Sequence, residues 1–172
     1  MNPRPRLLVL NQYYAPGVEA TARLLAQLCA DLADDFDITV VTGTLPNARA
    51  GHEVREAVDV IRVRSTTFPR RRLSLRALNY ATFLAQSLRV ALSTERPDVV
   101  LAMTDPPVIG AVAALVARRF RVPLVVVSQD VFPETAQRLG RIHNGLVLRL
   151  LRTLVGTYLR RADRIVAIGD TM

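Results

Sequence analysis

Two carboxylates that lie close together in the sequence, Asp130 and Glu134, are the residues of this 172-residue chain best suited to chemistry. They belong to the segment Ser128-Gln129-Asp130-Val131-Phe132-Pro133-Glu134, which directly follows an apolar run typical of a buried strand. A carboxylate in such a loop can act as a general base or bind the hydroxyl groups of a sugar. The alternative is that both side chains cap a helix or are simply solvated.

Three other polar segments also follow predicted strands: Asn11–Glu19, Thr42–Asn47 and Thr104–Pro107. In an open α/β sheet, ligands bind at the carboxyl ends of the strands. We therefore expect Gly17, Asp105 and Asp130 to converge on one cleft at that edge, with Gln129 and Glu134 beside them. This prediction rests on the shared position of all the segments after strands, because no single segment would support it alone.

Each residue of these segments also has a structural interpretation. The single Gly17 matches neither G-x-G-x-x-G nor a P-loop. It either lets helix N–H groups approach an anion or makes a tight turn. Glu19 suits the positive end of a helix dipole, and Asp105 can cap the helix that Pro106 begins. Tyr14 can either pack in the core or line a ligand groove, and the sequence does not choose between them.

The elements that position these segments alternate along the chain. Apolar runs predict strands at Leu7–Leu10, Phe36–Thr42, Val58–Val63, Val99–Met103, Leu124–Ser128 and Arg164–Ile168. Helical spacing predicts helices at Val18–Ala33, Leu75–Ser93 (capped by Ser74), Val108–Phe120 and Asn144–Arg161, with loops at 43–51 and 129–140. The alternation predicts an α/β fold with a doubly wound, mostly parallel sheet of six or seven strands. Residues 1–172 read as a single domain.

The chain carries a net charge of +8, and all of its basic residues are arginines. One cluster comprises Arg62, Arg64, Arg70, Arg71, Arg72 and Arg76. Such a run is either a solvated face or a contact for phospholipid headgroups, a pyrophosphate or nucleic acid. Because aromatic residues make up only 5% of the chain and Trp is absent, nucleic acid is the least favoured partner.

Two basic segments could contact an anionic membrane. In the final helix, Arg149, Arg152 and Arg160 oppose an apolar side made of Val147, Leu150, Leu151, Leu154, Val155 and Tyr158. That side either docks on lipid or packs on the sheet. Arg70, Arg71 and Arg72 lie in a predicted loop beside Phe68, and we expect this loop, more than the helix, to contact the membrane.

Several classes of site are not indicated. His52 and His143 are far apart and Cys29 falls in a core-like helix, so we expect no metal, and we expect no cofactor. No Ser-His-Asp arrangement follows a predicted strand. No signal peptide is visible and no run approaches the roughly 20 apolar residues of a membrane span, which predicts a soluble or surface-bound protein.

The ordered motifs together resemble the N-terminal domain of GT-B glycosyltransferases of the GT4-type, or group 1, superfamily. More narrowly, the chain is similar to the WcaI/WbuB-like enzymes of bacterial polysaccharide assembly. The resemblance covers essentially all 172 residues and rests on the segments 9–17, 19–23, 38–43, 104–107, 129–134 and 161–167. It implies a Rossmann-like domain that mainly binds a lipid-linked or glycan acceptor. A second domain, which this chain lacks, would bind the sugar nucleotide.

The resemblance also implies roles for individual residues. Gly17 and its neighbours would face the donor phosphates or the acceptor, and Asp130 would face the reacting sugars. Many relatives have a His where this chain has Gln129-Asp130, so a His-based role does not transfer. The implied enzymes usually retain anomeric configuration and need no metal. We expect the chain alone to be inactive, cytoplasmic and peripheral at the inner face of the membrane. It would be either one domain of a longer enzyme or the acceptor-binding and membrane-binding subunit of a split, two-chain glycosyltransferase.

Overall fold

Seven strands form one sheet in the order β3-β4-β2-β1-β5-β6-β7. The computed structural model describes residues 3–45, 48–66, 68 and 73–168. The strands are β1 (Arg6–Leu10), β2 (Asp37–Gly43), β3 (Gly51–Arg55), β4 (Val58–Val63), β5 (Val99–Met103), β6 (Leu124–Ser128) and β7 (Arg164–Ala167). The helices are α1 (Ala20–Leu32), α2 (Leu73–Ser93), α3 (Ile109–Phe120), α4 (Glu134–Arg138) and α5 (Gly145–Arg161). All strand pairs except β3·β4 are parallel, which confirms the predicted doubly wound α/β fold.

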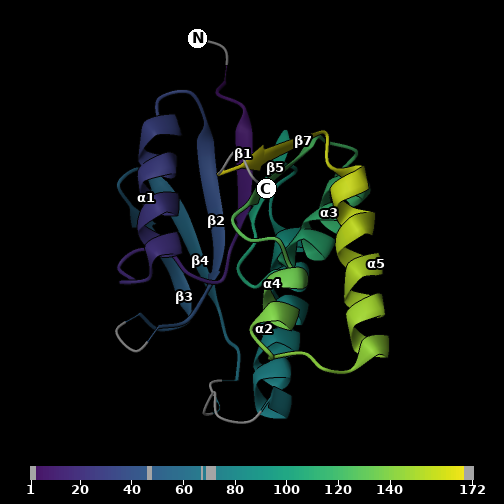
Figure 1. Cartoon of the computed structure of the whole chain (residues 1–172). Coiled ribbons are helices and arrows are strands. Elements are labelled where there is room, and N and C mark those ends of the chain that lie inside the picture. The colour runs from purple at the N-terminus through teal and green to yellow at the C-terminus, as the bar shows by residue number, and fades with distance from the viewer. Residues whose placement is uncertain (1–2, 46–47, 67, 69–72, 169–172) are drawn as a thin grey trace.

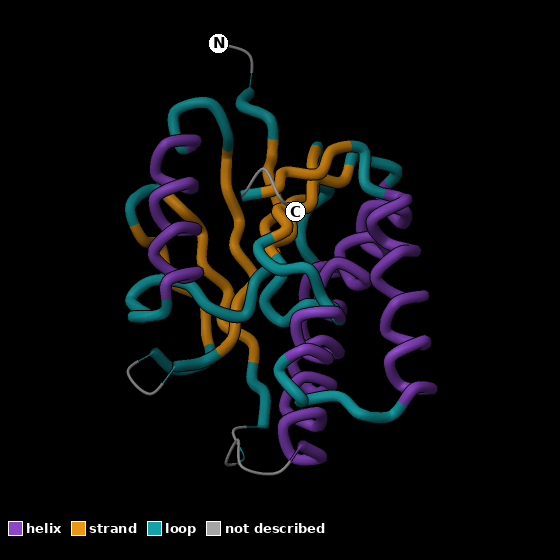
Figure 2. The backbone as a smooth tube through the Cα atoms, viewed as in Figure 1, coloured by secondary structure: helices purple, strands orange, loops and turns teal. Residues whose placement is uncertain are grey.

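Helices cover both faces of the sheet, as Figures 1 and 2 show. Successive side chains of a strand point to opposite faces, and β1 divides accordingly. Leu7 and Val9 join a core cluster with Leu25 and Cys29 of α1. Leu8 and Leu10 join the other cluster, which α2 and α3 contribute to. The buried strand β1 therefore has an apolar layer on each side, which explains its uninterrupted apolar sequence.

The predicted boundaries hold to within two residues for most elements. Val58–Val63 and Val99–Met103 match β4 and β5 as predicted. Two predictions were wrong in detail. Ser74 does not precede a helix, because α2 already begins at Leu73. The segment 129–140 is not wholly a loop, since it contains the short helix α4.

The antiparallel edge strand β3 was not predicted from the sequence. Its residues are almost all exposed, so it lacks the apolar alternation that marks a half-buried strand. A two-residue connection joins Arg55 to its partner Val58. The connecting residues, Glu56 and Ala57, have φ values of 51° and 64°. Positive φ at both central positions is the geometry of a type I′ hairpin turn, which usually carries Asn-Gly. Glu-Ala gives no such signal.

Replacing Ala57 by Gly should stabilise the protein by about 1 kcal/mol, because the left-handed region costs a Cβ-bearing residue energy that Gly avoids. The measurement is the free energy of unfolding in urea. Ala81→Gly, at an exposed position inside α2, is the matched control and should destabilise by about 1 kcal/mol. A destabilised Ala57→Gly variant would contradict the described turn.

Helix α5 packs on α3 and leaves much of its apolar surface in solvent. It begins after Asn144, whose side chain accepts hydrogen bonds from the backbone N–H groups of Leu146 and Val147. The Tyr158 ring lies over Gly110, where an added Cβ would come within 2.4 Å of the ring, and its hydroxyl donates to the Pro107 carbonyl at 2.8 Å.

The predicted apolar side of α5 is therefore only partly correct. Val155 and Tyr158 are buried and Leu151 is half-buried, but Val147, Leu150 and Leu154 are exposed. Leu148, which was not assigned to that side, is buried. The buried side of α5 is narrow because this helix packs on α3.

Candidate functional site

The candidate site lies at the carboxyl edge of the sheet, where the strand order changes direction between β1 and β5. The loops that follow these two strands are bonded to each other. The backbone N–H of Gln12 donates to the Asp105 carbonyl at 2.7 Å, and the Thr21 hydroxyl donates to the Asp105 carboxylate at 3.3 Å. The structure thus brings the segment 11–19, the start of α1 and Asp105 together across the switch point.

The loop after β6 adjoins the same edge. The backbone N–H of Gln129 donates to the Thr104 hydroxyl at 3.0 Å, and Thr104 directly precedes Asp105. Asp130 is exposed, and its carboxylate makes no hydrogen bond or ion pair that is recorded among the described residues. The neighbouring helix α4 has no side-chain cap. Of the two structural interpretations of Asp130, capping is therefore not what the structure shows.

Gly17 sits where the chain has no room for a side chain. An added Cβ would lie 2.7 Å from Glu19 Oε2, 3.0 Å from the Tyr14 carbonyl oxygen and 3.2 Å from the Ala22 Cβ. Its backbone N–H donates to the Tyr14 carbonyl at 3.0 Å. Close packing of a tight turn therefore explains the glycine. Glu19 follows as the N-cap residue of α1, and its side chain makes no cap hydrogen bond.

Three acceptor atoms in this loop are buried without a hydrogen-bond partner among the described residues: Asn11 Oδ1, Gln12 Oε1 and Glu19 Oε2. Asn11 is fully buried, and its Nδ2 group is held by the Tyr13 carbonyl at 2.8 Å. A buried polar atom without a partner is costly. Atoms that can only accept a hydrogen bond are suited to a ligand that presents hydroxyl groups.

Arg62, on β4, holds the segment 11–19 through its side chain. Its side chain is only 2% exposed, and its Nη2 donates to Glu53 Oε1 at 2.7 Å and to the Ala15 carbonyl. The sequence placed Arg62 in a basic cluster that could face an anionic partner; for this residue the interpretation was wrong, because Arg62 is internal. Its partner Glu53 lies on the unpredicted strand β3, so the sequence offered no signal for the pair. Thr21 and Thr104 belong to segments that the sequence pointed to, but neither was singled out as a site residue.

Tyr14 packs in the core and does not line a groove. It is 3% exposed and belongs to the core cluster that contains Leu25 and Cys29. Burial raises the pKa of the Tyr14 hydroxyl, and the neighbouring Cys29 raises it further. Burial likewise raises the pKa of the Cys29 thiol to about 11. Cys29 is the small buried side chain that the sequence predicted, and the burial of Tyr14 supports packing rather than ligand binding.

Glu134 is engaged in an ion pair. Arg152 donates from Nε to Glu134 Oε1 at 2.8 Å and from Nη2 to Gln137 Oε1 at 3.1 Å. The hydrogen bond from Arg152 lowers the pKa of the Glu134 carboxyl. Glu134 therefore links α4 to α5 through an ion pair. Its role is structural, in contrast to that of the exposed Asp130.

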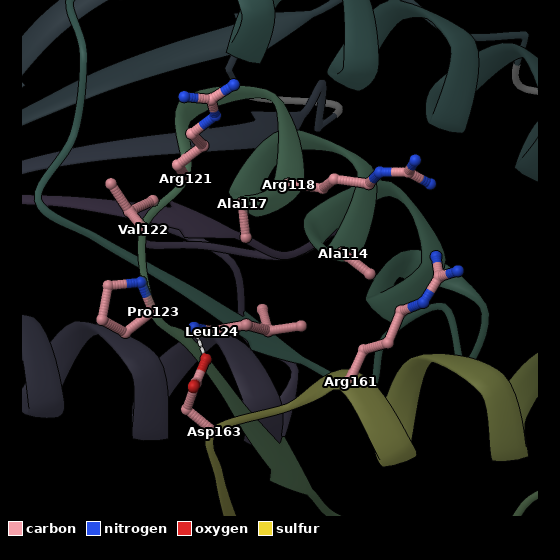
Figure 3. A pocket seen from close by; sticks show the side chains of 9 residues that line it. All are labelled: Ala114, Ala117, Arg118, Arg121, Val122, Pro123, Leu124, Arg161 and Asp163. Carbon is pink, nitrogen blue, oxygen red and sulfur yellow. Dashed lines mark hydrogen bonds between the residues drawn. The ribbon is translucent and has the colours of Figure 1, made fainter.

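Two surface cavities lie at the opposite, amino-terminal edge of the sheet. One, of about 740 Å³, is bordered by Arg118, Arg121, Leu124, Arg161 and Asp163, and Figure 3 shows it. The other, of about 650 Å³, lies between the amino ends of β1 and β2. Neither contains a residue of the candidate site. We place the site at the carboxyl edge because the bonded loops and the unpartnered acceptors are there.

The remaining predictions concern metals and membranes. No group of three or more metal-ligating side chains occurs in the part of the chain that the structure describes. Arg70, Arg71 and Arg72 lie outside the described residues, so their contact with a membrane stays a prediction. No described helix is both long and apolar enough to cross a bilayer.

Comparison with known proteins identifies the family. Among solved structures, a protein of unknown function from Vibrio parahaemolyticus has a TM-score of 0.47 and 12% identity, over 99% of this chain and 96% of that one. No curated protein matches the chain. A family described as "Glycosyl transferase 4-like domain" matches residues 4–172. The match confirms the GT4-type resemblance seen in the sequence, whereas the narrower WcaI/WbuB-like assignment stays a prediction. Because the family match spans almost the whole chain, the protein belongs to the glycosyl transferase 4-like domain family.

Proposed function

We propose that this chain is the acceptor-side domain of an enzyme that moves a sugar from a sugar nucleotide to a lipid-linked or polysaccharide acceptor. The proposed reaction retains anomeric configuration, as the GT4-type resemblance implies. The observation that carries the proposal is the set of unpartnered acceptors, Asn11 Oδ1, Gln12 Oε1 and Glu19 Oε2, at the carboxyl edge of the sheet. Family membership supports the reaction class.

In this proposal the two aspartates have different tasks. Asp130, exposed and without a recorded side-chain partner, is free to accept a proton from the attacking hydroxyl or to bind the hydroxyl groups of a sugar. Asp105 receives a hydrogen bond from Thr21 and, through its backbone, from Gln12. It therefore positions the loop that carries the unpartnered acceptors, and its carboxylate borders the same edge.

The sugar-nucleotide side of the site comes, in this proposal, from a second domain or from a separate chain. Strand β7 is an edge of the sheet, and its Ile165 and Val166 side chains, which point to opposite faces, are both exposed, so this edge is open to such a unit. Both arrangements predict that residues 1–172 alone do not transfer sugar.

The test is a transfer assay with a panel of UDP-sugars and GDP-sugars and a polyprenyl-phosphate-linked acceptor. The chain joined to, or mixed with, its donor-binding unit should release nucleoside diphosphate and add the mass of one sugar to the acceptor. If mixing separately made chains restores transfer, the two-chain arrangement is supported. Transfer by residues 1–172 alone would contradict the acceptor-side assignment, and absence of transfer from the assembled enzyme with every donor would contradict the reaction class.

A further inference from the structure

The outward face of α5 carries a stripe of exposed leucines. Leu146, Leu150 and Leu154 recur every four residues and are 66%, 61% and 40% exposed. Residues spaced by four lie on one side of a helix. Val147 is exposed beside them. Figure 1 shows α5 as the outermost helix on its side of the molecule. Because these leucines are exposed, this α5 stripe lies on a side of the helix other than the one that packs on α3.

Positive charge borders the α5 stripe, and nothing on the helix neutralises it. Arg149, Arg160 and Arg161 are exposed, and no ion pair of their side chains is recorded among the described residues. Helix α5 contains neither Asp nor Glu. At the carboxyl end of α5, Arg161 borders a cavity together with Arg118 and Arg121, which extends the basic surface (Figure 3).

Two acidic residues next to α5 are engaged by other groups. Glu134 of α4 is paired with Arg152, on another side of the helix. Asp163, just after α5, accepts a hydrogen bond from the backbone N–H of Leu124 at 2.8 Å. The three arginines beside the α5 stripe are therefore available to an anionic partner.

We propose that the α5 stripe docks on an anionic lipid bilayer, with the leucines in the interface and Arg149, Arg160 and Arg161 against the headgroups. A straight aliphatic stripe beside cationic side chains is the pattern of a helix that lies on a membrane. A second copy of the chain fits poorly, because a two-fold contact would oppose arginines with arginines. The stripe contains no aromatic residue of the kind that anchors protein interfaces.

The first test is co-sedimentation of the full chain with vesicles made of equal parts phosphatidylglycerol and phosphatidylcholine. The variant Leu146→Gln/Leu150→Gln/Leu154→Gln should bind at least about tenfold more weakly, since it removes the apolar contact. Gln keeps a high helix propensity, so the fold should be preserved. Arg23→Gln/Leu24→Gln, at exposed positions of α1 on the other face of the sheet, is the matched control and should bind like the wild type.

The second test separates charge from apolar contact. Arg149→Gln/Arg160→Gln/Arg161→Gln should bind the anionic vesicles roughly 100-fold more weakly. Loss of one to two arginines near an anionic surface weakens binding about tenfold. Wild-type binding should fall in 0.5 M NaCl, where charges are screened within about 4 Å. Vesicles of phosphatidylcholine alone should bind weakly. The arginine variant keeps the leucines, so it tests the proposal even if the leucine variant does not fold.

Three results would overturn the proposal. Wild-type and leucine-variant chains could bind equally, which would assign binding to another surface such as the segment 68–72. The wild type could fail to bind anionic vesicles at low salt. Alternatively, sedimentation equilibrium could show a dimer that only the leucine variant dissolves, which would make a second copy the occupant. None of these results bears on sugar transfer, so the proposed function is tested separately.

Discussion

Replacing Asp130 by Asn should lower the turnover number of the assembled enzyme by about 10²- to 10⁴-fold, the range expected for loss of a general base. Asn keeps the size of Asp but cannot take up a proton. The fold should survive, because the Asp130 side chain is exposed and has no recorded partner among the described residues. Turnover and the melting temperature, measured on the same preparation, check both halves of the prediction.

Asp34→Asn is the matched control for this substitution. Asp34 is also an exposed aspartate, but it lies in the turn before β2, at the amino-terminal edge of the sheet. Its substitution should leave turnover unchanged. Near-normal turnover of the Asp130→Asn enzyme would instead assign Asp130 to ordinary surface solvation.

Among the substitutions that we predict, removal of the Glu53 carboxylate should lower the free energy of unfolding the most. Arg62 has a side chain that is only 2% exposed, whereas the Glu53 side chain is 44% exposed. Glu53→Ala leaves a buried guanidinium without its counter-charge, which costs about 3 kcal/mol. Arg62 also holds the Ala15 carbonyl, so turnover should fall together with stability. The measurement is the free energy of unfolding in urea.

A double substitution distinguishes the buried charge from ordinary packing. Glu53→Ala/Arg62→Met removes the charge together with its partner, so it should be more stable than Glu53→Ala by more than 1 kcal/mol. The prediction fails if Glu53→Ala lies within about 0.5 kcal/mol of the wild type, the usual range for surface substitutions. It also fails if the stability changes of the single variants Glu53→Ala and Arg62→Met simply add up to that of the double variant.

Most of the fold could be predicted because the buried parallel strands read as uninterrupted apolar runs. Leu7–Leu10 and Val99–Met103 are apolar on both faces because a core cluster lies on each side of the sheet. Strand β3 could not be predicted, since it is exposed and its hairpin turn uses Glu56 and Ala57. The sequence left open whether the apolar side of the final helix packs on the sheet or docks on lipid, and it could not show which of its residues are exposed, because apolar residues at helical spacing normally indicate packing.

The location of the candidate site followed from strand ends, but the roles within it did not. Gly17, Asp105 and Gln129 lie in loops that the structure joins through hydrogen bonds involving Gln12, Thr21 and Thr104. Tyr14 and Glu134, in contrast, turned out to have partners in the core and on α5. Such assignments depend on side-chain contacts between distant elements, which sequence spacing does not contain.

Hydrogen exchange of the assembled enzyme, with and without a polyprenyl-phosphate-linked acceptor, tests the location of the site most directly. Our account predicts acceptor-dependent protection in the segments 11–22, 104–108 and 128–133, at the carboxyl edge of the sheet. Segments that border the two amino-edge cavities, such as 94–98 and 121–124, should exchange at unchanged rates. Protection confined to those amino-edge segments would contradict the account.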